Sequence, residues 1–271
     1  GSGSDLASLR MSAVEDGEDF ICSGHKLWTT HADAANWIFC LVRTSQERIP
    51  QQGITFLLID MTTPGVSVSP ILMLSGEHIQ NDVFFSEVRV PKANVVGKIG
   101  EGWTVAKYLM EFERGGGVAT PGLKARLGRI GAMATAEGLT GDHGFMARLS
   151  ALAIEIDALA AVELQILSNL SQGDAPGAKS SMMKTVGTEI SQRLTELAVE
   201  AAGVYAQPYQ PHATRPGGPT PNYRPPADQG HVGPDHSLTA AAKYLNDRAA
   251  SIYAGTNEIQ RNIMAKAVLG L

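Results

Sequence analysis

A short charged run, Met110-Glu111-Phe112-Glu113-Arg114, is one place in this sequence where a proton could be moved. A glutamate can act as a general base when burial raises its pKa above the reference value of about 4.3. On a solvated helix face the same side chain would only pair with a neighbouring cation, which is the commoner role. Glu111 lies two positions before Glu113 and therefore points off a different side of a helix.

Glycines and an aromatic residue near the start could hold a ligand. In Gly1-Ser2-Gly3-Ser4, backbone amides and the Ser4 hydroxyl could approach a phosphate, although this composition is also that of a flexible linker. Trp28 and Thr30 could supply an aromatic wall and a hydrogen-bonding group, although a tryptophan in a strand is more often a core residue. The seven histidines have no ligand spacing, so we expect no metal site.

The secondary structure that must position these residues changes along the chain from predicted strands to predicted helices. Short β-rich runs separated by turn residues predict strands at Trp37–Val42, Ile54–Ile59, Gly65–Val68 and Val83–Val90. After Trp103 the apolar residues follow a helical period, as in Leu149, Leu152, Ile156, Leu159, Val162 and Ile166. The fold class is therefore α+β: an antiparallel β-domain over 1–97, then a C-terminal helical bundle over 98–271. We expect no Rossmann fold, because no Gly-x-Gly-x-x-Gly motif is present.

Composition excludes several classes of function. The chain has 271 residues, 44% of them apolar, and a net charge of −5, so we expect a globular protein that does not bind nucleic acid. No apolar run is long enough to span a bilayer, and no basic and apolar leader opens the chain. With only Cys22 and Cys40, which form no Cys-x-x-Cys pair, a cytoplasmic location is expected.

The segment 207–237 contains eight prolines and cannot sustain a helix. It must be a long loop within the helical half. Two interpretations remain open: a disordered insertion, or an ordered surface crossing that shapes a pocket or an interface.

Several motifs together resemble the acyl-CoA dehydrogenase family. They are GSGSDLASLR (1–10), GHKLWTT (24–30) with Asn36-Trp37, GITFLLIDMTTPGVSV (53–68), NDVFFSEVRVPKANVVGKIGEGW (81–103) and IYAGTNEIQRNIMAK (252–266). The resemblance covers nearly all of the chain except 138–145 and the proline-rich loop. It implies an FAD cofactor, with Gly3, Ser4, Trp28, Thr30, Thr256 and Glu258 as binding residues. Members of the family usually begin with a helical domain of about 120 residues, and the sequence above does not contain it. We therefore expect either a fragment or a protein whose N-terminal helices are cleaved, disordered or encoded elsewhere.

The resemblance also implies a reaction: the α-hydrogen of an acyl-CoA thioester leaves as a proton and the β-hydrogen passes as hydride to flavin N5. In many members the base is a glutamate just before the Gly-Thr of the C-terminal signature, where this chain has Ala254. A second group of members carries the glutamate on the helix after the β-domain, before an arginine, which selects Glu113 here. The Ala254 backbone N–H and a flavin ribityl hydroxyl would polarise the thioester carbonyl. Arg114 would be a substrate-side or structural cation, and Thr256 could also N-cap the last helix.

Two departures from the family pattern concern residues that one subunit donates to the FAD site of its neighbour. Thr140-Gly141-Asp142-His143-Gly144-Phe145 has no arginine where the family has Arg-x-x-Phe-Gly, and Val199 stands where a glutamine is expected. We therefore expect a hetero-oligomer of an α2β2 kind, whose second subunit supplies both groups. The chain resembles the large subunit of pimeloyl-CoA dehydrogenase-type and sterol side-chain-type members.

Competing interpretations of the function remain. The leading one is acyl-CoA dehydrogenation, with an electron-transfer flavoprotein as the acceptor. The others are a non-catalytic scaffold subunit, an acyl-CoA oxidase, and a flavin monooxygenase of the same fold. Chain length and branching of the acyl group cannot be deduced, because they depend on the shape of the pocket.

Overall fold

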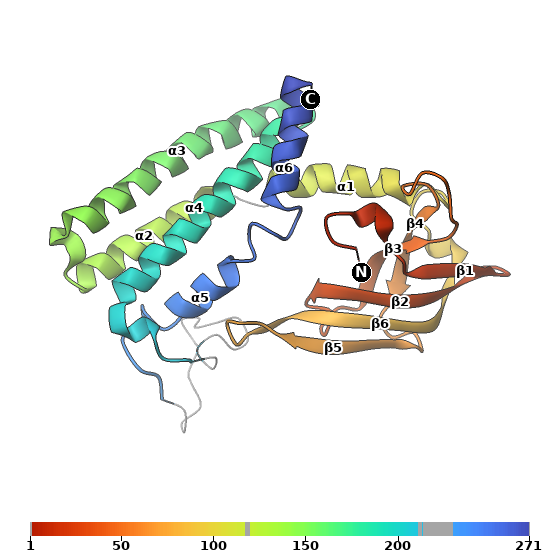
Figure 1. Ribbon diagram of the computed structural model, residues 1–271, viewed down its shortest axis with the longest axis horizontal. Coiled ribbons are helices and arrows are strands. Elements are labelled where there is room, and N and C mark those ends of the chain that lie inside the picture. Colours follow the sequence, from red (N-terminus) through yellow and green to blue (C-terminus); the bar gives the residue numbers. More distant parts are fainter. Residues whose placement is uncertain (1, 117–119, 211–212, 214–229, 271) are drawn as a thin grey trace. The chain divides into compact units, whose positions relative to one another are not determined.

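The computed structural model describes residues 2–116, 120–210, 213 and 230–270, with the side chains of 111–116 left aside. The chain divides into two compact units (Figure 1). The first comprises the residues up to Met73 together with His78–Met110, and the second comprises Leu74–Glu77 and the residues from Glu111 onward.

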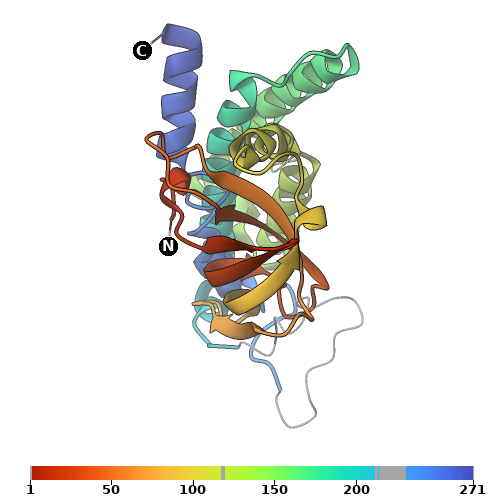
Figure 2. The same ribbon diagram turned by 90° about the vertical axis from the view of Figure 1, so that its right-hand side faces the viewer.

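The first unit is built on a six-stranded sheet of spatial order β4-β3-β1-β2-β6-β5. Its strands are β1 (Ser12–Asp16), β2 (Asp19–Thr30), β3 (Trp37–Arg43), β4 (Ile54–Asp60), β5 (Val66–Leu72) and β6 (His78–Pro91). The predicted strands are all present. The sheet is mixed rather than wholly antiparallel, because β1 pairs with β3 in parallel at Ser12 and Arg43. Its twist is visible in Figure 2, as expected for L-amino acids.

Alternation along the strands places the core of the first unit on one face of the sheet. In β6, for example, Val83, Phe85, Val88 and Val90 are buried while the residues between them are mostly exposed. They pack with Phe20, Cys22, Cys40 and Val42 from the neighbouring strands. The period of two is interrupted once, between Phe85 and Val88, where the pairing with β2 shifts register. Such a period is typical of a sheet with one face in the core.

The second unit is a helical bundle. Helix α1 (Gly102–Gly116) begins in the first unit and ends in the second. The others are α2 (Thr120–Ala136), α3 (His143–Ser171), α4 (Ala178–Ala202), α5 (Ala240–Asp247) and α6 (Asn257–Met264). Helices α2, α3 and α4 pack against one another, and α5 and α6 pack against α4.

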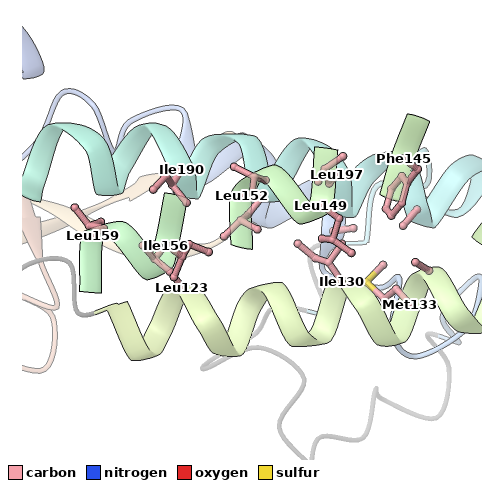
Figure 3. Close-up of a cluster of buried hydrophobic side chains, with 14 of the residues drawn as sticks. Leu123, Ile130, Met133, Phe145, Leu149, Leu152, Ile156, Leu159, Ile190 and Leu197 are labelled. Carbon is pink, nitrogen blue, oxygen red and sulfur yellow. The ribbon is translucent and has the colours of Figure 1, made fainter. Parts of the chain in front are cut away.

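The predicted apolar stripe of α3 lies in the core of this bundle. Figure 3 shows Leu149, Leu152, Ile156 and Leu159 pointing between the helices towards Leu123, Ile130 and Met133 of α2 and Ile190 and Leu197 of α4. The α+β class with its C-terminal bundle is thus confirmed. None of the described helices is long and apolar enough to cross a membrane.

Most of the proline-rich segment, 211–212 and 214–229, lies outside the described residues. Its two described ends are joined by a buried glutamine: Gln210 Nε2 donates to the Val232 carbonyl at 3.1 Å, and Val232 N–H donates to Gln210 Oε1 at 2.6 Å. Gln210 therefore fixes where the segment leaves the bundle and where it returns.

Candidate functional site

Trp28 lies in a β-bulge. The pairing of β2 with β6 shifts register between Lys26 and Thr29, and Trp28 has a left-handed backbone with φ of +62°. A bulge re-aims a side chain, and a positive φ is uncommon for a bulky residue. The indole is 59% exposed. The sequence motif predicted a role for Trp28 but not the bulge that presents it.

A buried asparagine supports this bulge. Asn81 Nδ2 donates to the Thr29 carbonyl and to Asp33 Oδ1, both at 3.2 Å, and Asn81 Oδ1 lies 2.8 Å from His78 Nε2. Asn81 is fully buried, and these contacts satisfy its amide. Sequence reasoning missed it; the only available signal was its place at the start of a family-like strand motif.

Thr30 follows the bulge with an exposed hydroxyl. It exchanges hydrogen bonds with the Gln80 amide at 3.1 to 3.3 Å, on a surface where a ligand could replace this partner. Trp28 and Thr30 therefore come from the same end of β2, one offering an aromatic surface and the other a hydrogen-bonding group.

Gly3 and Ser4 are exposed in the segment that precedes β1. The space beside Gly3 is open, with no atom within 4 Å of an added Cβ. The residues that follow are anchored: Ala7 is buried, and Arg43 Nη2 donates to its carbonyl at 2.6 Å. The exposed segment at Gly3 and Ser4 is therefore anchored at Ala7, and its own backbone amides stay accessible.

In the second unit, Ala254 and Gly255 precede α6 with two successive left-handed conformations, φ of +54° and +82°. Within the described part of the chain, the Ala254 N–H donates no hydrogen bond. The turn is closely packed, since a Cβ on Gly255 would lie 2.4 Å from Gln260 Nε2. An exposed alanine in a strained turn, with an unused N–H, suits the binding of an oxygen acceptor.

Thr256 ends this turn and N-caps α6, its Oγ1 accepting a hydrogen bond from Ile259 N–H at 3.3 Å. Glu258 lies in the first turn of the helix with an exposed carboxylate. Hydrogen bonds from its own backbone N–H and from the Thr256 hydroxyl lower the pKa of Glu258. Ala254, Thr256 and Glu258 are therefore brought together at one helix terminus.

A buried polar contact holds α6 against α4. Lys184 Nζ donates to Asn257 Oδ1 at 2.8 Å, and Thr188 lies within hydrogen-bonding distance of the same amide. Lys184 and Asn257 are almost fully buried, and burial lowers the pKa of Lys184. This contact fixes the start of α6, and with it the Ala254 turn; neither residue was singled out from the sequence.

Glu113 and Arg114 belong to the last turns of α1, but their side chains lie outside the described residues. Their predicted roles therefore stay predictions.

The two regions that depart from the family pattern lie close together in the bundle. Asp142 N-caps α3, accepting hydrogen bonds from Gly144 and Phe145 N–H. Arg148, farther along α3, forms a two-pronged ion pair with Glu200, at 2.5 and 2.8 Å. Glu200 directly follows Val199. A cation is thus present in this region, but a carboxylate of the same chain engages it.

The sequence matches two family models. Residues 1–88 match "Acyl-CoA dehydrogenase, middle domain", and residues 100–269 match "Acyl-CoA dehydrogenase, C-terminal domain".

Among curated relatives from Mycobacterium tuberculosis, Acyl-CoA dehydrogenase IpdE1 is 32% identical over 275 residues, and Acyl-CoA dehydrogenase FadE34 is 32% identical over 276. Both alignments cover 100% of this chain, but 64% of IpdE1 and 34% of FadE34, so the chain spans less than two thirds of either relative. A solved structure, the ChsE4-ChsE5 complex from the same organism, includes a chain that is 26% identical with a TM-score of 0.79. That alignment covers 100% of this chain and 66% of that one.

The sheet unit, the helical bundle and both family matches agree in order and extent, and the chain belongs to the acyl-CoA dehydrogenase family, of which it holds the middle and C-terminal domains.

Proposed function

We propose that this chain carries the catalytic residues for FAD-dependent α,β-dehydrogenation of an acyl-CoA thioester. The observation that carries the proposal is the Ala254 turn, in which a strained backbone keeps an N–H unused at the start of α6. An oxygen on which negative charge develops, such as that of a thioester losing its α-proton, is the group such a donor stabilises.

The described residues fit an FAD cofactor. The exposed Trp28 indole offers a flat apolar surface for a ring system, Thr30 offers a hydroxyl, and the accessible amides near Gly3 and Ser4 suit a pyrophosphate. Thr256 and Glu258 are the proposed contacts at the start of α6. Bound FAD would supply the acceptor for the β-hydrogen.

In this proposal, side chains and backbone groups of this chain remove the α-proton of the acyl-CoA and stabilise the charge that develops. Glu113 removes the α-proton, because position 254 carries no carboxylate, and the Ala254 N–H donates to the thioester carbonyl. Arg114 is proposed as a substrate-side cation. Exclusion of water by a bound acyl group would raise the pKa of Glu113 and strengthen it as a base.

The test is Glu113→Gln in the assembled holoenzyme, with Glu111→Gln as the matched control. We expect Glu113→Gln to retain FAD, measured by its absorbance, and to slow flavin reduction by acyl-CoA by about a thousandfold, within the range for loss of a general base. Glu111→Gln should reduce at the wild-type rate. Unchanged turnover in Glu113→Gln would instead favour a scaffold role, and hydrogen peroxide release in air would favour an oxidase.

We further propose that the active enzyme is a hetero-oligomer located in the cytoplasm, with an electron-transfer flavoprotein as the electron acceptor. Arg148 is paired with Glu200, and position 199 carries valine, so this chain is poorly equipped to donate a cation and an amide to a neighbouring flavin. A structure similar to this chain is a complex of two named components, ChsE4 and ChsE5. Cys22 and Cys40 are free thiols, in keeping with a reducing compartment.

A further inference from the structure

A pocket of about 620 Å³ lies within the second unit, among α2, α4 and α5, whose positions can be followed in Figure 1. Ile130 and Met133 of α2 and Leu194 of α4 give it an apolar wall. Its polar lining includes Arg126 and Asp247. Apolar walls with a few convergent polar groups are typical of small-molecule sites.

Asp247 lines this pocket with a carboxylate oxygen that lacks a hydrogen-bond donor among the described residues. It is 9% exposed, and its Oδ2 has no hydrogen-bond partner among the described residues. Its Oδ1 is 3.9 Å from Arg126 Nη1, too far for a hydrogen bond, while Arg126 Nη1 donates to Ser191 Oγ. A buried carboxylate oxygen without a donor is costly, so a donor supplied by a ligand would stabilise this arrangement.

Tyr253 connects the pocket to the candidate reaction site. Its side chain lines the pocket, and the next residue is Ala254, whose N–H is the proposed donor to the thioester carbonyl. Tyr253 and Asp247 both line the pocket, and burial together with the nearby charge of Asp247 raises the pKa of Tyr253. An acyl group held at Ala254 therefore has this pocket beside it.

Two features define the occupant. At about 30 Å³ for each water-sized group, the volume accommodates roughly twenty such groups, more than a short acyl chain provides. The polar lining selects its chemistry. A carboxylate would be attracted by Arg126, Arg129 and Lys243, but it has no hydrogen to donate to Asp247 Oδ2. An ammonium could donate but would face the same three cations, and a plain hydrocarbon would leave Asp247 Oδ2 without a donor among the described residues. A hydroxyl avoids all three conflicts.

We infer that this pocket receives the far end of a large acyl group that carries a hydroxyl, and that the hydroxyl donates a hydrogen bond to Asp247 Oδ2. Asp247 then determines specificity, and it takes no part in the chemical step. This assignment rests on the proposed acyl-CoA dehydrogenase function, because it places the thioester at Ala254.

The test uses the holoenzyme and ω-hydroxyacyl-CoAs of graded chain length, each paired with the unsubstituted acyl-CoA of the same length. For every pair, kcat/KM is measured from flavin reduction and Kd by calorimetry. At the length that lets the hydroxyl reach Asp247, we expect the hydroxylated member to be favoured by about tenfold or more, the range for a hydrogen bond to a charged group. Asp247→Leu should abolish this preference.

Asp247→Asn serves as a second, milder variant that preserves the shape of the side chain, and it should reduce the preference without abolishing it. Asp157→Asn, on the exposed face of α3, is the matched charge control and should leave the preference unchanged. Equal Kd values within every pair for the wild-type enzyme would overturn the inference, whether or not turnover occurs. Binding that discriminates between the members, without flavin reduction by either, would contradict the proposed function and leave the pocket assignment standing.

Discussion

Trp28 and Ala254 have left-handed backbones that residues with a Cβ seldom adopt. Such strain persists only where the surroundings impose it, and it concentrates at functional sites. Asn81 donates a hydrogen bond to the Thr29 carbonyl beside Trp28, and Gln260 Nε2 donates one to the Gly255 carbonyl beside Ala254. Two of the residues that the family motifs indicated for ligand contact are thus also residues at which the backbone itself is strained.

At Ala254 the strain can be measured. Ala254→Gly removes the Cβ that disfavours a φ of +54°, and part of this gain is offset by the greater freedom of glycine in the unfolded chain. We expect a net rise of roughly 0.5–1 kcal/mol in the free energy of unfolding, measured by chemical denaturation. The same substitution at Ala161, on the exposed face of α3, should lower it by about 1 kcal/mol. A loss at position 254 equal to that at position 161 would argue against strain.

At the scale of the elements, the contact between α4 and α6 decides where the Ala254 turn begins. Asn257→Ala would leave the buried Lys184 ammonium without its 2.8 Å acceptor. We expect a loss of about 2 kcal/mol in the free energy of unfolding and weaker FAD retention, because α6 is no longer held at its first residue. Asn257→Asp restores an acceptor and should recover most of the stability. Wild-type stability in Asn257→Ala would show that α6 is held by other contacts.

Two buried thiols in the core of the sheet should make the stability of the folded protein depend on pH. Burial raises the pKa of Cys22 from 9.0 to about 11 and that of Cys40 to about 12. The folded protein therefore keeps two protons that the unfolded chain releases above pH 9. Their contribution to stability is complete below pH 9 and is lost as the pH rises from 9 to 12.

We expect neither thiol to react with a disulfide reagent at pH 8 in the native protein, and both to react in denaturant. The double variant Cys22→Ala, Cys40→Ala should show a smaller decline in stability above pH 9 than the wild type. Rapid labelling of the native protein would show that the core opens more readily than its burial indicates.

At the scale of the whole molecule, residues 140–145 and Val199 depart from the family pattern of groups donated to a neighbouring FAD site. This departure predicts how the protein assembles. We expect the chain expressed alone to hold less than one FAD per chain, and co-expression with a second subunit that carries Arg-x-x-Phe-Gly to bring occupancy to stoichiometry. Arginine to glutamine in that motif of the second subunit should lower occupancy again, since the pyrophosphate loses its charge-assisted partner. A yellow, active homo-oligomer with stoichiometric FAD would contradict the hetero-oligomer.

Much of the fold could be predicted from local pattern. The runs at Trp37–Val42 and Ile54–Ile59 became β3 and β4, each only one residue longer, because β-branched and apolar residues bounded by turns favour strands. The α3 stripe is equally local. The parallel pairing of β1 with β3 could not be predicted in this way. It joins Ser12 to Arg43, and a contact between distant segments leaves no periodic signal in either of them.

The sequence by itself determined the fold class, the family, and the residue types available for chemistry: a glutamate on α1, an alanine in place of the usual base, and an aromatic residue beside a threonine. Tertiary structure alone decided how the backbone presents Trp28 and Ala254, which buried amides lie beside them, and that Asp247 Oδ2, in a pocket also lined by Tyr253, has no hydrogen-bond partner among the described residues. These features depend on packing between segments far apart in the chain. Such packing determines the backbone conformation and burial of single residues, and it can override the preferences of the local sequence.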